Sequence, residues 1–253
     1  ALLDNNAYLL QNGQYRLLTG SGQQPISFYW QSKAWHLKEN WLFRNNHGDA
    51  IDLRKASTGD SSYFHSNRFS FDEEGRLLIS GSSLYLVDKD LSVHGKQLPY
   101  FTDNLVSANR NEYIAITRNA AIWNYSWNAD SLKGKQFVSQ LPHLDPRCAI
   151  RWNQDTFCIG TRFQGIIWMI IQQGMAREIG RISTAKGLSN NFVIALAKKQ
   201  NQLYVGTGTG FDRITLNQKD TTVENLGAAN NLYASFNWVQ KNKLDEVYAL
   251  SSD

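Results

Sequence analysis

The histidines and cysteines are the side chains best suited to bind zinc, because imidazole nitrogens and thiolates are its usual protein ligands. The chain has five histidines and two cysteines. None of them stand at the close spacing that a zinc site requires. The histidines are His36, His47, His65, His94 and His143. We therefore predict no metal site and no cofactor.

Two further patterns suggest catalysis only superficially, and a third is absent. The acidic run 72–74 could supply paired carboxylates for glycoside hydrolysis, but it stands between two strand-like segments, where a solvated turn is expected. The glycine-rich run 206–210 lacks the Gly-Lys-Ser/Thr ending of a phosphate loop and precedes a strand. The chain has no Gly-x-Ser-x-Gly nucleophile motif. We expect no catalytic residue.

Cys148 and Cys158 are ten residues apart, around a hairpin that we expect near Asn153. They could face each other across two antiparallel strands and form a disulfide. They could equally be two small apolar side chains in neighbouring core strands. The sequence leaves both alternatives open.

The composition indicates a folded chain without a nucleic-acid surface. Hydrophobic residues make up 42% and aromatic residues 12% of the 253 residues, more than a disordered chain would have. The net charge is +4, yet the basic residues are scattered and form no run. No stretch approaches the roughly 18 apolar residues of a membrane span, and the first residues lack the features of a signal peptide, which could have been removed. We expect no nucleic-acid partner and no direct membrane insertion by this segment.

The clearest sequence unit runs from Gly187 to Leu226 and predicts four short strands. An apolar strand of residues 192–197 is followed by a polar turn and a second strand of residues 203–207. A third strand follows the glycine-rich turn, and a fourth ends the unit. Helical periodicity is absent, so the unit predicts an antiparallel sheet.

The same order of strands and turns recurs along the chain. The large apolar residue of each second strand marks the repeat, and successive markers are separated by 36 to 47 residues. The markers are Trp35, Leu77, Tyr113, Phe157, Tyr204 and Tyr248. A repeat of 40 to 50 residues with four strands per unit is typical of β-propeller blades. We therefore predict an all-β chain that forms one β-propeller domain.

The two chain ends each contain half of a unit. Residues 232–250 read as first and second strands, and residues 7–18 read as third and fourth strands. Together they would form a sixth blade and close the ring, which removes open sheet edges. The alternative is a fragment of a longer repeat array. The predicted blades are 26–58, 66–98, 104–141, 146–183, 187–226, and 230–253 plus 1–20.

The segment from Gly187 through Leu196, with Leu203 through Arg213, resembles the repeat of the two-component-regulator propeller family. That pattern is Gly-Leu-Ser-Asn-Asn-x-Val, a polar turn, Leu-Trp-Ile-Gly-Thr and Gly-Leu-x-Arg. Tyr204 stands here for the tryptophan and Phe211 for the leucine. The resemblance covers about 30 residues well and is weaker elsewhere. Members of the family usually have seven blades, so the predicted six depart from its pattern.

The resemblance implies a periplasmic or extracellular ligand-sensing domain of a bacterial membrane receptor. The signalling module, a histidine kinase or a diguanylate cyclase, would then belong to other domains of the receptor. The partners implied are these domains and a small-molecule or glycan ligand.

Loops at the mouth of a propeller often carry its function. In the predicted register, the loops between second and third strands include Glu39, Arg118, Asn119 and Arg162, and the loop before the fifth blade includes Asn190 and Asn191. Tyr63, Phe64, Tyr100, Asn104 and His143 stand in the corresponding loops of other blades. Arginines with aromatic rings suit a sugar that has a carboxylate or sulfate group.

We therefore expect a non-catalytic sensor that binds its ligand at the channel mouth through Glu39, Arg118, Asn119, Arg162, Asn190 and Asn191. One alternative is a scaffold that binds proteins through the broad propeller face. Another is a carbohydrate-active propeller enzyme, for which we find no convergent acid and base.

Overall fold

The protein is described from a computed structural model. It describes the residues 2–3, 6–11, 14–17, 26–31, 33–38, 41–44, 50–56, 68–72, 74–98, 102–109, 111–117, 121–128, 131–139, 141, 144–216, 221–229, 236–241 and 247–251. The chain divides into two compact units, and each is described by itself. The first consists of residues 1–102 and 128–132, and the second of residues 103–127 and 133–253.

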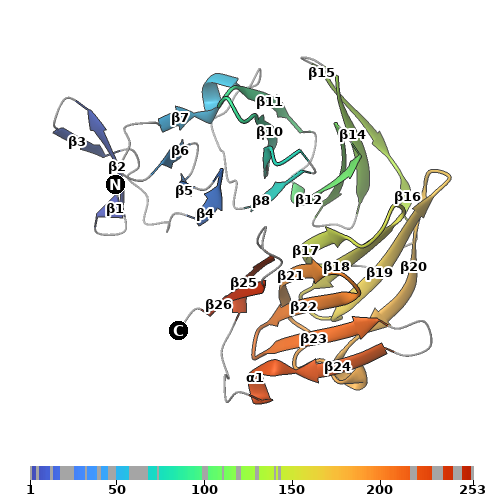
Figure 1. The fold of residues 1–253 in the computed structure, drawn as a ribbon. Helices are drawn as coiled ribbons and strands as arrows, with labels where there is room; N and C mark the ends of the chain where they lie inside the picture. Colours follow the sequence, from blue (N-terminus) through green and yellow to red (C-terminus); the bar gives the residue numbers. More distant parts are fainter. Residues whose placement is uncertain are drawn as a thin grey trace. The chain divides into compact units, whose positions relative to one another are not determined.

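The first unit contains three antiparallel sheets (Figure 1). The first has three strands, β1 (Leu2–Leu3), β2 (Asn6–Gln11) and β3 (Gln14–Leu17). The second is the meander β4 (Ile26–Trp30), β5 (Lys33–Lys38), β6 (Trp41–Arg44) and β7 (Ala50–Asp52). The third is the meander β8 (Arg68–Phe71), β9 (Leu77–Ser80), β10 (Ser83–Val87) and β11 (Val93–Gln97). A 3-10 helix, η1 (Leu53–Ala56), follows β7.

The core of the first unit lies between the sheets β4–β7 and β8–β11. Its fully buried members include Trp35 and Leu77, two of the predicted markers, together with Tyr85 of β10. Phe69 and Phe71 pack against this cluster from β8. The alternation of large apolar side chains along each strand therefore buries one sheet face against the next, as in stacked blades.

The second unit contains most of the sheet β12–β15 and all of three further sheets. The first meander is β12 (Thr102–Asn109), β13 (Glu112–Thr117), β14 (Ile122–Asn128) and β15 (Ser131–Gln136). The next is β17 (Pro146–Arg151), β18 (Thr156–Thr161), β19 (Ile166–Gln172) and β20 (Met175–Ile182). The third is β21 (Val193–Lys199), β22 (Gln202–Thr207), β23 (Phe211–Leu216) and β24 (Thr221–Asn225). A two-stranded sheet of β25 (Phe236–Lys241) and β26 (Val247–Ser251) completes the unit.

Short elements join these sheets. The strand β16 (Val138–Ser139) adds to β20 in parallel, so this sheet has five strands instead of the four expected. The 3-10 helix η2 (Thr184–Lys186) and the short helix α1 (Leu226–Ala229) follow β20 and β24. Neither helix was expected from the sequence.

The second unit has two large core clusters, one on each face of the sheet β17–β20. Phe157 and Met169 pack on one face against Ile116 of β13. Cys158 and Trp168 pack on the other face, in the same cluster as Val193, Leu203 and Ile214 of the sheet β21–β24. The sheet β17–β20 is therefore buried on both faces, which explains why β18 is buried at every position.

The turn after the second strand of a blade has a repeated buried hydroxyl group. The Oγ1 atoms of Thr117, Thr161 and Thr207 donate to the carbonyl oxygens of Ala121, Gly165 and Gly210 over 3.1, 2.8 and 2.9 Å. Each hydroxyl also accepts a backbone N–H from within its turn. The hydroxyl thus gives a turn N–H its acceptor and adds a second bond to a carbonyl that already accepts the N–H of the same threonine. This role accounts for the recurring threonine at this position.

The first strands of three successive sheets share an irregular pairing. The register shifts between Pro146 and Cys148 in β17, between Val193 and Ala195 in β21, and between Phe236 and Trp238 in β25. Each shift leaves one extra residue near the start of the first strand. Such β-bulges bend a strand and re-aim the side chain of the extra residue.

The expectation of an all-β chain made of repeated antiparallel sheets is confirmed. The five contiguous meanders match the predicted units, and the turn at Asn153 forms, because its side-chain oxygen accepts the N–H groups of Asp155 and Thr156. The two chain ends form two separate sheets, β1–β3 in one unit and β25–β26 in the other. The shared sixth blade therefore stays a prediction.

One local expectation needs correction, and one pair of open alternatives is decided. Asp72 is 9% exposed, so it is not the solvated turn residue that we expected. Its carboxylate accepts the backbone N–H groups of Glu74 and Arg76 and pairs with the Arg76 side chain at 2.6 Å. Cys148 and Cys158 are both free thiols. The register pairs Cys148 with Gly160 and Cys158 with Ile150, so they do not stand directly opposite each other.

Candidate functional site

Four loops come together at one end of the sheets β17–β20 and β21–β24, and main-chain hydrogen bonds connect them. In the first sheet, Arg162 N in the β18–β19 turn donates to Asp145 O before β17 over 2.9 Å. In the second sheet, Gly208 N in the β22–β23 turn donates to Phe192 O before β21 over 2.9 Å. Between the sheets, Gly165 N donates to Asn191 O over 3.1 Å. We call this end the loop face of the two sheets.

The predicted site residue Arg162 lies on the loop face and is accessible. Its side chain is 53% exposed, and its Cζ atom lies 5.1 Å from the ring centroid of Phe163. Its Nη1 atom is 3.8 Å from Asp145 Oδ2, which is a loose ion pair. Phe163 itself is 67% exposed. The turn therefore presents a guanidinium and an aromatic ring together to solvent.

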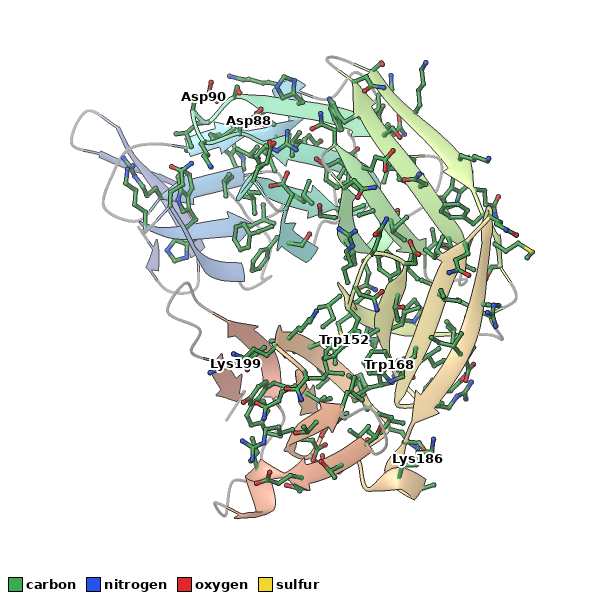
Figure 2. The ribbon with its side chains drawn as sticks, turned by 45° about the vertical axis from the view of Figure 1, so that its right-hand side comes forward. Asp88, Asp90, Trp152, Trp168, Lys186 and Lys199 are labelled. Carbon is green, nitrogen blue, oxygen red and sulfur yellow. The ribbon has the colours of Figure 1, made fainter. Side chains whose placement is uncertain are left out.

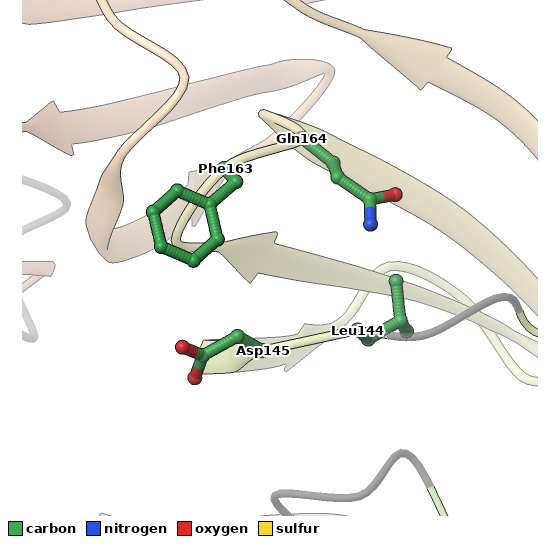
Figure 3. A pocket seen from close by; sticks show the side chains of 4 residues that line it. All are labelled: Leu144, Asp145, Phe163 and Gln164. Carbon is green, nitrogen blue, oxygen red and sulfur yellow. The ribbon is translucent and has the colours of Figure 1, made fainter.

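A pocket of about 220 Å³ lies beside this turn (Figure 3). Phe163 and Gln164 line it from the β18–β19 turn, and Leu144 and Asp145 line it from the segment before β17. Gln164 Oε1 accepts a hydrogen bond from Arg181 Nη1 over 2.8 Å, which fixes the amide. The pocket thus has two apolar walls, one carboxylate and one amide, a combination that suits a small ligand with both apolar and polar faces.

The predicted residues Asn190 and Asn191 also lie on the loop face, but their side chains hold the loops in place. Asn190 Oδ1 accepts Phe192 N over 2.8 Å, and Asn190 Nδ2 donates to Thr209 Oγ1 over 3.3 Å. Asn191 Oδ1 accepts Thr184 N over 2.9 Å. The sequence pattern thus predicted the end of the sheet at which these residues lie. Their side chains position the backbone of the loops there.

A buried carboxylate stands behind the loop before β21. Asp212 is fully buried, and its Oδ2 atom accepts Ser189 N over 3.0 Å and Ser189 Oγ over 2.7 Å. Ser189 Oγ also lies 2.9 Å from Thr207 Oγ1. Burial raises the pKa of Asp212, and the two hydrogen bonds from Ser189 only partly oppose that shift. The network fixes the loop from beneath.

Arg147 is a residue of this end that the sequence reasoning missed. It is the extra residue of the β-bulge in β17, and its Cζ atom lies 5.7 Å from the ring centroid of Phe192. Its Nε atom is buried and has no hydrogen-bond partner. The signal that could have found it is a charged residue at the start of a first strand, directly before the apolar residues 148–150.

Some predicted residues cannot be placed on this face. Glu39, Arg118 and Asn119 lie outside the described residues, as do Tyr63, Phe64, Tyr100 and His143. Asn104 was expected in a loop, but it lies within β12 and its side chain is buried. The structure therefore brings together Arg162, Asn190 and Asn191 of the six predicted site residues.

The opposite end of the same two sheets has different chemistry. Trp152 and Trp168 pack edge to face, with ring centroids 5.1 Å apart (Figure 2). Lys198 Nζ lies 4.6 Å from the centroid of Trp152 and donates to its carbonyl oxygen. At this end the ammonium group of Lys198 and the two tryptophan rings therefore contact one another. On the loop face, Arg162 and Phe163 are exposed to solvent.

The described part of the chain has neither a cluster of metal-binding side chains nor a helix that could span a membrane. In that part, no group of three or more His, Cys, Asp or Glu side chains is arranged to hold a metal ion. None of the helices described there has the length and apolar character needed to cross a membrane.

Comparisons with known proteins identify the fold. No family model matches the sequence, and no curated protein matches it. Among solved structures, a catalytically inactive virginiamycin B lyase from Staphylococcus aureus with quinupristin matches with a TM-score of 0.65 at 13% identity, covering 96% of this chain and 83% of that one. The β-propeller domain of Cps50 (Swd1) from Myceliophthora thermophila matches with a TM-score of 0.64 at 11% identity, covering 93% and 82%.

The extracellular domain of a putative one-component system from Bacteroides thetaiotaomicron is a further match. Its TM-score is 0.59 at 15% identity, and the match covers 98% of this chain and 38% of that one. At such low identities these matches carry the fold alone. Together with the repeated four-stranded sheets, they show that the chain has a β-propeller fold.

Proposed function

We propose that this chain is a non-catalytic ligand-sensing propeller domain of a bacterial two-component-type receptor, placed outside the cytoplasm. The loop face of the sheets β17–β20 and β21–β24 would bind the ligand. The observation that carries the proposal is the exposed pair Arg162 and Phe163 beside the pocket lined by Asp145 and Gln164. The other parts of the proposal are a sixth blade made from both chain ends and a receptor whose remaining domains lie beyond this chain.

The chemistry of the loop face favours a sugar with a carboxylate or sulfate group. An exposed aromatic ring covers the apolar face of a sugar, and a guanidinium binds oxyanions through paired N–H donors. The hydrogen bonds among the four loops pre-organise these groups, which lowers the entropic cost of binding. The likeness of the fold to an extracellular domain of a bacterial signalling system adds support for a sensing role.

A thermal-shift screen tests this proposal. The panel would contain oligosaccharides with uronate or sulfate groups and their neutral counterparts. A ligand at a hundred times its dissociation constant stabilises the folded state by about 2.7 kcal/mol, which raises the Tm of a domain of this size by about 5 °C or more. Arg162→Ala should abolish the shift, whereas the control Arg177→Ala, on the exposed side of β20, should keep it. A shift that Arg162→Ala leaves unchanged would contradict the proposed site.

A protein-binding scaffold is the second candidate, and one observation favours it. Met175 and Ile179 on the outer strand β20 are 41% and 48% exposed. Exposed apolar side chains on a strand near the edge of a sheet can contact a partner protein. If this is the function, Ile179→Asp should abolish partner binding, and no oligosaccharide should shift the Tm.

A further inference from the structure

The backbone places Arg147 differently from its neighbours in β17. Pro146 pairs with Thr161 and Cys148 pairs with Gly160, so Arg147 has no partner residue in β18. An extra residue of this kind turns its side chain away from the regular alternation of the strand. The β-bulge therefore directs the guanidinium toward the loop that precedes β21.

The ring of Phe192 holds this guanidinium in place. Arg147 Cζ lies 5.7 Å from the ring centroid, within the range of a cation–π contact. The backbone of Phe192 is fixed on both sides, by Asn190 Oδ1 at 2.8 Å and by Gly208 N at 2.9 Å. A Cβ atom on Gly208 would approach Phe192 Cδ1 to 3.1 Å, so the ring packs closely on the β22–β23 turn. The platform beneath Arg147 is thus rigid.

Arg147 lacks the counter-charge that nearby arginines have. Arg162 lies near Asp145, Arg181 pairs with Glu178 at 2.8 Å, and Arg213 pairs with Glu224. Arg147 has no ion pair or hydrogen bond to any residue of the described part of the chain, and its Nε atom is buried. A buried donor without an acceptor is costly, and a charged one more so. The terminal nitrogens of Arg147 are not among the buried atoms, so their N–H donors can reach a ligand.

We propose that Arg147 binds an oxyanion group of the ligand through its two terminal NH2 groups, in the paired geometry that guanidinium offers to a carboxylate, sulfate or phosphate. The inference rests on the proposed function, because it assigns the charged group of the sensed ligand to a particular residue. The neighbouring blade supports this assignment. The extra residue in the β-bulge of β21 is Ile194, so the backbone feature repeats while the charge does not.

An NMR titration tests the proposal on the wild-type chain. Labelled protein is titrated with sodium sulfate and separately with sodium acetate, with sodium chloride keeping the ionic strength constant. The arginine Nε–H resonance that disappears in Arg147→Lys reports on Arg147. We expect a saturable shift of this resonance with at least one probe, and the two probes distinguish a tetrahedral anion from a planar carboxylate.

Two variants and one control complete the experiment. Arg147→Gln should weaken binding of the same probe about tenfold to a hundredfold, whereas Arg177→Gln removes an equal charge on β20 and should bind as the wild type does. Phe192→Leu keeps the charge, removes the platform and should weaken binding severalfold. If Arg147→Gln does not fold, the titrations of the wild type and of Arg147→Lys still show whether Arg147 binds the anion.

The outcomes separate this inference from the proposed function. No saturable response of Arg147 to either probe would overturn the inference, even if the oligosaccharide screen finds a ligand that depends on Arg162. An Arg147 response without any ligand in the screen would overturn the proposed function and leave the anion site standing.

Discussion

The sheets β17–β20 and β21–β24 share the same backbone features, but they carry different side chains on the loop face. Both begin with a β-bulge in the first strand, and both end the second strand with a buried threonine that caps the following turn. In β17–β20 the bulge residue is Arg147 and the turn presents Arg162 and Phe163. In β21–β24 the bulge residue is Ile194 and the turn consists of glycine and threonine.

The difference separates what builds a blade from what gives it a function. The features that the two sheets share satisfy backbone hydrogen bonds and bury apolar faces, which every blade needs. The features that differ are exposed or lack an internal partner, and they gather on β17–β20. In β21–β24 two polar side chains at this end, Ser189 and Asp212, bond to each other. The second sheet thus fixes the loop before β21, and the Phe192 ring of this loop packs against Arg147 of the first sheet.

The largest expected difference between the two sheets concerns their marker residues. Phe157 is 2% exposed in the core of β17–β20, whereas Tyr204 is half-buried and its hydroxyl donates to Gln202. Phe157→Ala should reduce the free energy of unfolding by about 3 to 5 kcal/mol, and Tyr204→Ala by about 1 kcal/mol. Urea denaturation measures both. Equal losses would show that the two sheets do not differ in packing as described.

The turn threonines should give the next largest effect. Thr161→Val and Thr207→Val each remove a buried hydroxyl that bonds the turn backbone, at a cost of about 1 to 3 kcal/mol. Thr207→Val should cost more, because this hydroxyl also bonds Ser189 Oγ. The exposed Thr222→Val in β24 is the control and should change the free energy of unfolding by less than about 0.5 kcal/mol. Turn variants as stable as this control would contradict the capping role.

A pH dependence should distinguish the two sheets. Because burial raises the pKa of Asp212, the folded state holds this proton more tightly than the unfolded chain. The resulting stabilisation is full below the unfolded pKa of about 3.9, and it is lost as the pH rises through the higher folded pKa. Ile167 takes the corresponding place in β17–β20, two residues after the turn glycine.

Asp212→Asn should therefore gain stability relative to the wild type as the pH rises from 4 to 7. Urea denaturation at several pH values measures the difference between the two proteins. A difference that does not change with pH would show that Asp212 does not titrate differently in the folded and unfolded states.

The smallest effect on stability is expected on the loop face. Phe163 is 67% exposed, so Phe163→Ala should change the free energy of unfolding by less than about 0.5 kcal/mol. The same variant should abolish the Tm shift produced by an oligosaccharide ligand, because it removes the stacking surface. A large loss of stability with ligand binding retained would make Phe163 a packing residue.

The strand order of the blades could be predicted from the sequence, because each strand alternates in pattern and the turns have polar or glycine residues. The markers Trp35, Leu77, Tyr113 and Phe157 are indeed fully or almost fully buried. Arg162 was predicted because it follows a strand end directly, and its place in the turn depends only on local register.

Arg147 and Asp212 could not be predicted in the same way. A β-bulge shifts the alternation by one residue, so the direction of the Arg147 side chain depends on its pairing with β18. The role of Asp212 depends on Ser189, 23 residues earlier, which the fold brings within 2.7 Å. The roles of Asn190 and Asn191 were missed for a related reason, because the backbone groups that they bond come from the folded loops.

The most direct test of the central claim is a map of amide shifts on binding. The panel oligosaccharide that gives the largest Tm rise is titrated into labelled protein. We predict that the shifts concentrate at residues 144–147, 162–165 and 190–192 on the loop face. Shifts concentrated at residues 152–155 and 198–202, at the opposite end of the same sheets, would contradict the account.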